Sequence, residues 1–221
     1  MHYVIIGNGG AGISALQTIR ENDKKGDITI ISREKYPAYS PCSLPDLIGG
    51  EIDKPTIFRF DNNFYENLNS NFLKNAEAIE ISTNYKELKL ADGKKIKFDK
   101  LLISAGAKPI APKQIKGLNL EGVHIMGTLD SALDILKHVK SGAKHAVIVG
   151  GGFIGIETAI MLKQQGLNVT IVEMLPNILS RMLDPDISKK VEEILRENKI
   201  NLILNDTVKS INGGNIVTGV S

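Results

Sequence analysis

The sequence contains few cysteine and aromatic residues and has no large excess of one charge, and each of these excludes a class of protein. Its 221 residues include one cysteine and no tryptophan, and aromatic residues make up 5% of the chain. A single cysteine cannot close a disulfide within the chain, so we expect a fold that does not depend on an oxidising compartment. An excess of one charge is also missing, because 27 Lys and Arg residues are balanced by 25 Asp and Glu residues. This balance predicts no basic track along a phosphate backbone, and therefore no nucleic-acid partner.

Hydrophobic runs long enough for a membrane are absent from the sequence as well. The longest strongly apolar stretch without Asp, Glu, Lys or Arg, residues 145–156, is too short and too rich in glycine to cross a bilayer. Residues 1–7 contain neither a basic leader nor a long apolar segment, so we expect no signal peptide. Together with an ordinary hydrophobic content of 42%, these features predict a soluble, cytoplasmic globular protein that contacts no membrane.

A glycine-rich pattern occurs twice in the chain. Residues 3–12 are YVIIGNGGAG, and residues 146–155 are AVIVGGGFIG. Each copy is a β-branched run followed by G-x-G-x-x-G and then by apolar residues at helical spacing. A second strand-like run follows each helix, at residues 27–32 and 168–173. The pattern predicts two β-α-β units and hence an α/β fold.

Each glycine of the pattern has its own physical reason. The first permits a tight turn out of the strand, the second lets the backbone approach a pyrophosphate, and the third lets the helix pack closely on the strand. The helix amino terminus then presents free N–H groups to the phosphates. Two copies in this context favour two dinucleotide sites over two glycine turns that bind no nucleotide. The candidate cofactor-binding residues are Gly7, Gly9, Gly10, Ala11 and Gly12 in the first copy and Gly150, Gly152, Phe153, Ile154 and Gly155 in the second.

The ends of the two second strands differ. Glu173 closes the later one, where a carboxylate accepts hydrogen bonds from ribose hydroxyls and repels a 2′-phosphate, so NADH is favoured over NADPH. In the first unit the corresponding residues are Ser32, Arg33 and Glu34. Ser32 or Glu34 is placed to bind a ribose, with a solvated loop charge as the alternative for Glu34.

Further elements are expected between and after the two units. Residues 76–82, 86–90 and 95–98 are predicted to form short strands, and residues 101–104 a buried strand that leads into Ala105 and Gly106. Residues 128–141 are predicted to form a helix. Pro109 and Pro112 bound a stretch typical of a domain junction, so we expect domains at 1–112 and 113–221.

The last predicted helix begins at Asp184, which precedes a proline. Its buried face is expected to contain the four apolar residues at helical spacing, Ile187, Val191, Ile194 and Leu195. The four histidines have no metal-ligand spacing, so no metal site is expected.

The two glycine patterns, the segment SAGAKP at 104–109 and the segment GGGFIGIE at 150–157 resemble the FAD-dependent pyridine nucleotide-disulfide oxidoreductase family over essentially the whole chain. The resemblance implies two Rossmann-like units of the three-layer type with a small antiparallel β insertion. It also implies that the first unit holds FAD, with Ala105 and Gly106 nearby, and that the second holds the nicotinamide dinucleotide, with Glu157 near the nicotinamide.

The segment YSPCSLPDLI at 39–48 is similar to the redox-cysteine segment of the single-cysteine branch of that family, which includes coenzyme A disulfide reductases, sulfur reductases and NADH oxidases. Cys42 is then the catalytic thiol, and a helix that starts at Ser43 would stabilise its thiolate. If Cys42 is instead an inert packing residue, rubredoxin-type or nitrite-type reductases are the better match. Oxidases and peroxidases of this kind usually carry a histidine where this chain has Gly10, which favours a disulfide or sulfur reductase.

The resemblance implies an enzyme that passes hydride from NADH to the flavin and on, through Cys42, to a small-molecule acceptor: a disulfide, a polysulfide or oxygen. It also implies a homodimer for the full-length protein. Because family members continue beyond the position of Ser221, we expect these residues to be the N-terminal portion of a longer protein. The alternative is a non-catalytic nucleotide-binding fragment or a subunit of a larger complex.

Overall fold

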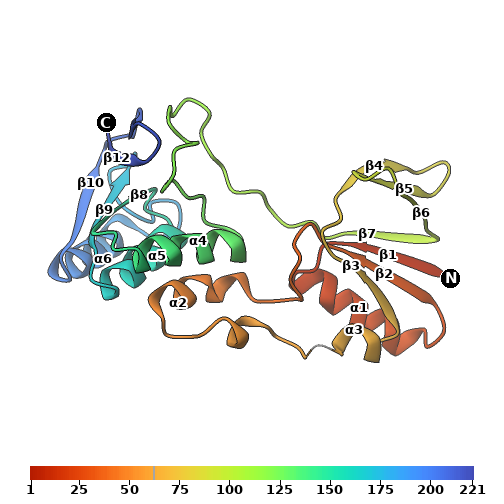
Figure 1. Ribbon diagram of the computed structural model, residues 1–221. Coiled ribbons are helices and arrows are strands. Elements are labelled where there is room, and N and C mark those ends of the chain that lie inside the picture. The colour runs from red at the N-terminus through yellow and green to blue at the C-terminus, as the bar shows by residue number, and fades with distance from the viewer. Residues whose placement is uncertain (62) are drawn as a thin grey trace. The chain divides into compact units, whose positions relative to one another are not determined.

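The chain forms two compact units (Figure 1). The computed structural model describes residues 1–61 and 63–221. The first unit consists of Met1–Ser40 and Pro55–Ala107, and the second of Pro41–Lys54 and Lys108–Ser221. The segment around Cys42 therefore packs with the second unit, although it lies in the first half of the sequence.

The first unit is built around a four-stranded parallel sheet in the order β3-β2-β1-β7. Its two central strands are the β-branched runs on either side of the first glycine pattern, because such residues fit a pleated surface that is covered on both faces. Its elements are β1 (His2–Ile6), α1 (Gly10–Asn22), β2 (Asp27–Ile31), α3 (Phe64–Asn67), β3 (Ser70–Leu73), β4 (Ala78–Ser82), β5 (Glu87–Leu90), β6 (Lys95–Lys97), β7 (Lys100–Ile103) and a 3-10 turn at Pro55–Ile57.

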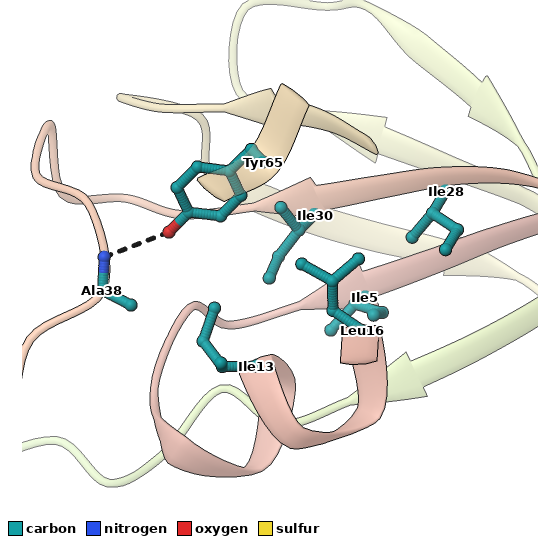
Figure 2. Packing of buried hydrophobic residues seen from close by; sticks show 7 residues of the cluster. All are labelled: Ile5, Ile13, Leu16, Ile28, Ile30, Ala38 and Tyr65. Atoms are coloured by element: carbon teal, nitrogen blue, oxygen red, sulfur yellow. Dashed lines mark hydrogen bonds between the residues drawn. The ribbon is translucent and has the colours of Figure 1, made fainter. Parts of the chain in front are cut away.

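Adjacent residues of β1 point to opposite faces of this sheet and belong to two different clusters. Ile5 packs with Ile13 and Leu16 of α1, and the ring of Tyr65 closes the same cluster (Figure 2). Val4 packs on the other face, against Leu88 and other residues of the antiparallel sheet β4-β5-β6. The core thus lies on both sides of the sheet, and it fixes the strand end that carries the first glycine loop.

The second unit contains a three-stranded parallel sheet in the order β10-β9-β8 and a two-stranded antiparallel sheet, β11-β12. Thr128 and Ser131 form a capping box that starts α4, which accounts for the predicted helix. The short helix α2 contacts α4 and α5. The elements are α2 (Leu44–Gly49), α4 (Leu129–Lys140), β8 (His145–Val149), α5 (Phe153–Gln164), β9 (Asn168–Glu173), α6 (Pro185–Glu197), β10 (Ile200–Leu204), β11 (Ile211–Gly213), β12 (Val217–Val220) and a 3-10 turn at Pro41–Ser43.

The predicted buried face of the last helix is wrong at two positions. Ile187 and Ile194 of α6 are 46% and 56% exposed, whereas Ser188 and Glu192 are buried together with Leu195. The helix begins as predicted, at Pro185 after Asp184. Hydrophobic periodicity predicted the wrong buried face because hydrogen bonds to a neighbouring loop, described below, stabilise the buried carboxylate of Glu192.

The prediction of a buried strand at 101–104 is also wrong. Leu102 and Ile103 are 37% and 62% exposed. The reason is position, because β7 pairs with β1 alone and lies at the edge of the sheet.

Candidate functional site

In the first glycine loop, the outer glycines are required by packing and the middle one is not. A Cβ at Gly7, whose φ is +113°, would overlap the carbonyl oxygen of Ser104, and a Cβ at Gly12 would overlap the carbonyl oxygen of Gly7. No protein atom lies within 4 Å of the Cβ position at Gly9. Glycine at that position therefore leaves open space beside the backbone, which is what a bound diphosphate requires.

The second glycine loop repeats this geometry in part, because the Cβ position at Gly150, unlike that at Gly7, has no described protein atom within 4 Å. Gly150 has φ of +108°, and a Cβ at Gly155 would overlap the carbonyl oxygen of Gly150. The Cβ position at Gly152 again has no protein atom within 4 Å. Phe153 and Ile154, in the first turn of α5, are 52% and 60% exposed.

Both helices that follow these loops begin without a side-chain cap. Gly9 and Gly152 are the N-cap residues of α1 and α5, and neither helix has an acidic residue in its first turn. The amide N–H groups and the positive end of each helix dipole thus lack a neutralising side chain in the first turn. Such a terminus binds anions, and phosphate is the usual one.

Glu173, at the end of β9, is bonded to the second glycine loop. Its carboxylate accepts the N–H of Gly151 at 2.6 Å and the N–H of Leu175 at 2.8 Å. It lines a hollow of about 200 Å³ together with Gly152 and Arg181. Leu179, whose φ is 52°, lines the same hollow. Arg181 follows Glu173 by eight residues, and no local pattern in the sequence signals that the two line one hollow.

The three candidate residues at the end of β2 lie together in the first unit. The Ser32 hydroxyl accepts the N–H of Glu34 at 3.1 Å, and the Glu34 carboxylate accepts the hydroxyl of Tyr39 at 2.7 Å. Arg33 lies 3.7 Å from the carboxylate of Glu77 at the edge of a cavity of about 380 Å³. The Glu34 carboxylate thus has a protein partner, and its binding of a ribose stays a prediction.

Ala105 and Gly106 follow β7 beside the first glycine loop. The hydroxyl of Ser104 donates to the carbonyl of Ile6 at 3.0 Å, and the Ala105 nitrogen lies 3.2 Å from the Cβ position of Gly7. Gly106 has φ of +70° and no protein atom within 4 Å of its Cβ position. Glycine is needed there for its backbone conformation rather than for a close approach by another protein segment.

Asn8 and Tyr65 hold the first glycine loop, and neither was a candidate from the sequence. The Tyr65 hydroxyl donates to the Asn8 side chain at 2.7 Å. The same hydroxyl accepts the N–H of Ala38 at 3.0 Å (Figure 2). Burial raises the pKa of Tyr65, so the phenol keeps the proton that it donates. Tyr65 and Asn8 are 57 residues apart, so no local pattern in the sequence signals their contact.

Cys42 is exposed and lies in the 3-10 turn that precedes α2. That helix begins after Ser43, as predicted, and ends at Gly49, with Gly50 as its C-cap residue at φ of +75°. The side chain of Gln165, which follows α5, donates to the carbonyl of Gly49. Glu157, on α5, is exposed.

The described residues offer neither a metal-binding cluster nor a membrane-spanning helix. Residues 1–61 and 63–221 contain no cluster of His, Cys, Asp and Glu that would hold a metal ion. Within the same residues, no helix combines the length and the apolar character needed to cross a bilayer.

Comparison with known proteins identifies relatives along the whole chain. The chain is 34% identical to an NADH oxidase of Methanocaldococcus jannaschii, with 100% of this chain and 50% of the relative covered. It is 31% identical to an NAD(P)H coenzyme A polysulfide/persulfide reductase of Pyrococcus horikoshii, with 95% and 47% covered. The chain thus spans about half the length of the relatives it matches.

A solved structure and a family model agree with these matches. The structure of an NAD-dependent persulfide reductase from A. fulgidus superposes with a TM-score of 0.92 and 31% identity, over 97% of this chain and 42% of the other. The family model described as pyridine nucleotide-disulphide oxidoreductase matches residues 1–221. With both glycine loops in place, the chain belongs to the pyridine nucleotide-disulphide oxidoreductase family.

Proposed function

We propose that this chain is part of an FAD-dependent oxidoreductase that takes electrons from NADH and passes them through Cys42 to a disulfide or sulfur acceptor. The observation that carries the proposal is the repeated loop geometry, in which Gly9 and Gly152 each leave space beside an uncapped helix terminus. Two such phosphate-binding loops in one chain fit the binding of two dinucleotides. Relatives named as NAD(P)H-dependent sulfur and persulfide reductases support the choice of acceptor.

We assign FAD to the first unit, as a Rossmann-like domain whose sheet is covered by α1 on one face and by β4-β5-β6 on the other. The loop from Gly7 to Gly12 would hold the diphosphate, with Ser32 or Glu34 at the ribose. The cavity beside Arg33 suits the adenine end, and Ala105 and Gly106 would border the cofactor near the first glycine. When bound, FAD supplies reversible two-electron chemistry that no protein side chain provides.

We assign NADH to the second unit. The loop from Gly150 to Gly155 would hold its diphosphate, Glu173 its adenosine ribose, and Phe153, Ile154 and Glu157 would lie toward the nicotinamide. The negative charge of Glu173 disfavours a 2′-phosphate, whereas Arg181, which lines the same hollow, would attract one. Because the Glu173 carboxylate is bonded to the glycine loop itself, we expect its charge to dominate, so NADPH should bind less well. The domain limits of 1–112 and 113–221, a homodimer and a cytoplasmic location stay predictions.

Cys42 would exchange with the acceptor. Its thiolate attacks one sulfur of the acceptor disulfide, a new S–S bond forms to Cys42, the acceptor S–S bond breaks, and the other sulfur leaves as a thiolate. Two electrons, drawn overall from NADH, release the second half of the acceptor and restore the Cys42 thiolate. The exposure of Cys42 supports access by an external disulfide.

A different activity, NADH oxidation by oxygen, is the second candidate, since the M. jannaschii relative carries that name. The absence of a side chain at Gly10, with no protein atom within 4 Å of its Cβ position, argues against a general acid there. A reductase that does not use Cys42 is a third candidate, because rubredoxin reductases of pseudomonads are 28% and 29% identical to this chain.

The proposal is tested by anaerobic titration of the intact, FAD-loaded protein with NADH, followed by a panel of acceptors. We expect NADH to bleach the flavin and coenzyme A disulfide or polysulfide to restore its colour. Cys42→Ser should keep the bleaching and reduce disulfide turnover by at least about 100-fold, since no thiolate remains to exchange. Ser43→Ala is the matched control, because Ser43 makes no capping hydrogen bond.

Each alternative has its own outcome in this titration. Failure to bind FAD would favour a non-catalytic nucleotide-binding fragment. Full disulfide turnover by Cys42→Ser would reject the thiol mechanism. Rapid turnover with oxygen or a one-electron protein acceptor alone would favour the oxidase or the rubredoxin-type reductase.

A further inference from the structure

We infer that Glu192, a buried carboxylate on α6, is a positioning residue for the dinucleotide site of the second unit and sets NADH affinity without touching the nucleotide. The inference rests on the proposed function of that site. The helix α6 follows the second glycine pattern in the chain and contains none of its residues.

Glu192 lies on the buried face of α6 with Ser188 and Leu195, outside the face that hydrophobic periodicity predicts. Only 4% of it is exposed, whereas Ile187 and Ile194 of the same helix are 46% and 56% exposed. Burying a carboxylate costs several kcal/mol unless hydrogen bonds compensate. A helix that turns two isoleucines outward and a glutamate inward therefore needs specific partners for that glutamate.

Those partners belong to a single loop. The Oε1 atom of Glu192 accepts the side-chain amide of Asn177 at 3.1 Å and the backbone N–H of Ile178 at 3.3 Å. Its Oε2 atom lies 3.5 Å from the guanidinium of Arg196, one turn along the helix. Because the N–H of Ile178 is buried, the carboxylate satisfies a donor that water does not reach.

The loop held in this way forms one wall of the hollow at Glu173. Leu179 and Arg181 line that hollow. Ile178 is fully buried against Gly151, where a Cβ would come within 2.8 Å of the isoleucine side chain. Leu179 has φ of 52°, a conformation that costs free energy in a non-glycine residue and persists only where the surroundings enforce it.

A continuous series of contacts thus connects Glu192 to the glycine loop. Leu179 donates its N–H to the carbonyl of Gly151 at 2.9 Å, and Gly151 donates its own N–H to Glu173 at 2.6 Å. Without the acceptor on α6, the wall loses the bond that holds Ile178, and Gly151 and Glu173 lose their fixed positions. The expected consequence is weaker NADH binding with little change in the reaction of bound NADH.

The test compares Glu192→Ala and Glu192→Gln with the exposed neighbour variant Glu193→Gln in the intact protein. We expect Glu192→Ala to weaken NADH binding about tenfold or more by fluorescence titration, which corresponds to the loss of one or two buried hydrogen bonds. Glu192→Gln keeps one acceptor oxygen and should weaken binding only a few-fold. In steady-state assays KM should rise with kcat nearly unchanged, which a general loss of folding would not produce.

Hydrogen exchange gives a readout that does not depend on activity. The amides of Ile178 and Leu179 should exchange faster in both Glu192 variants than in Glu193→Gln. If Glu192→Ala does not fold, Glu192→Gln decides by the same two measurements. Wild-type affinity and unchanged amide protection in the Glu192 variants would overturn the inference, whereas a wild-type protein that binds no NADH would overturn the proposed function instead.

Discussion

The carboxylate of Glu173 accepts the backbone N–H of Gly151 at 2.6 Å, so the acidic end of β9 is bonded directly to the glycine loop that precedes α5. Its other oxygen accepts the N–H of Leu175 at 2.8 Å. Each oxygen keeps a lone pair free for another donor. The same carboxylate can therefore shape the loop and still accept a ribose hydroxyl.

Changing Glu173 to glutamine should affect both roles. The amide nitrogen of glutamine cannot accept, so Gly151 or Leu175 loses its partner, and the negative charge is removed. We expect NADH affinity to fall about tenfold while NADPH affinity falls less, because repulsion of the 2′-phosphate is gone. Fluorescence titrations with both nucleotides measure this, and Glu197→Gln, on the exposed end of α6, is the control. An unchanged preference for NADH would mean that Glu173 serves the loop alone.

Alanine substitutions at two glycines of the second loop should separate packing from ligand binding. Gly155→Ala would press a methyl group into the carbonyl of Gly150 and should lower the free energy of unfolding by about 1–3 kcal/mol. Gly152 has φ of −83° and an open Cβ position, so Gly152→Ala should lower the free energy of unfolding by at most about 1 kcal/mol, the usual cost of alanine at a helix N-cap.

The same Gly152→Ala protein should bind NADH at least about tenfold more weakly, because the methyl group occupies the space next to the diphosphate. Urea unfolding measures the free energy of unfolding of each variant, and nucleotide titration measures its affinity for NADH. Normal binding by Gly152→Ala would indicate that this loop carries no diphosphate.

Arg20 should matter for stability although it lies outside every candidate site. It is 8% exposed, and its guanidinium donates to the four carbonyls of Asp23, Gly26, Leu68 and Asn69 at 2.7–2.9 Å. Arg20→Lys cannot reach all of them, so we expect a loss of about 2–4 kcal/mol in the free energy of unfolding. The exposed Arg59→Lys is the control, and equal stability of the two variants would contradict this expectation.

The second unit should lose stability in mild acid because of His124. Burial lowers the pKa of His124 and the neighbouring His138 lowers it further, while Asp134 opposes both. The Nε2 atom of His124 is buried and has no hydrogen-bond partner among the residues that the structure describes. The unfolded chain, with a pKa of about 6.5, then binds a proton more readily than the folded chain.

The free energy of unfolding should therefore fall as the pH decreases through about 6.5 and level off below the folded-state pKa. Thermal unfolding between neutral and mildly acidic pH measures the slope. His124→Phe should flatten it, and His145→Asn, at an exposed position on β8, should not. An equal slope in wild type and His124→Phe would assign the acid sensitivity to other groups.

Short sequence patterns correctly predicted the elements whose structure depends on neighbouring residues. Both glycine loops, the strands β1, β2, β8 and β9, and the starts of α2 and α6 follow from residues close in sequence, because turn geometry and helix caps depend on neighbours. Contacts between distant residues were not predictable in this way. Tyr65 reaches Asn8 across 57 residues, and no spacing rule pairs them.

Short-range patterns are enough to predict two β-α-β units with a glycine loop in each, since G-x-G-x-x-G between a strand and a helix encodes its own turn. Which side chains support those loops depends instead on packing between distant residues. Glu192 is buried and Ile194 exposed because the energy of a side chain depends on the partners that folding brings to it, and hydrogen bonds to Asn177 and Ile178 outweigh hydrophobic periodicity at that position.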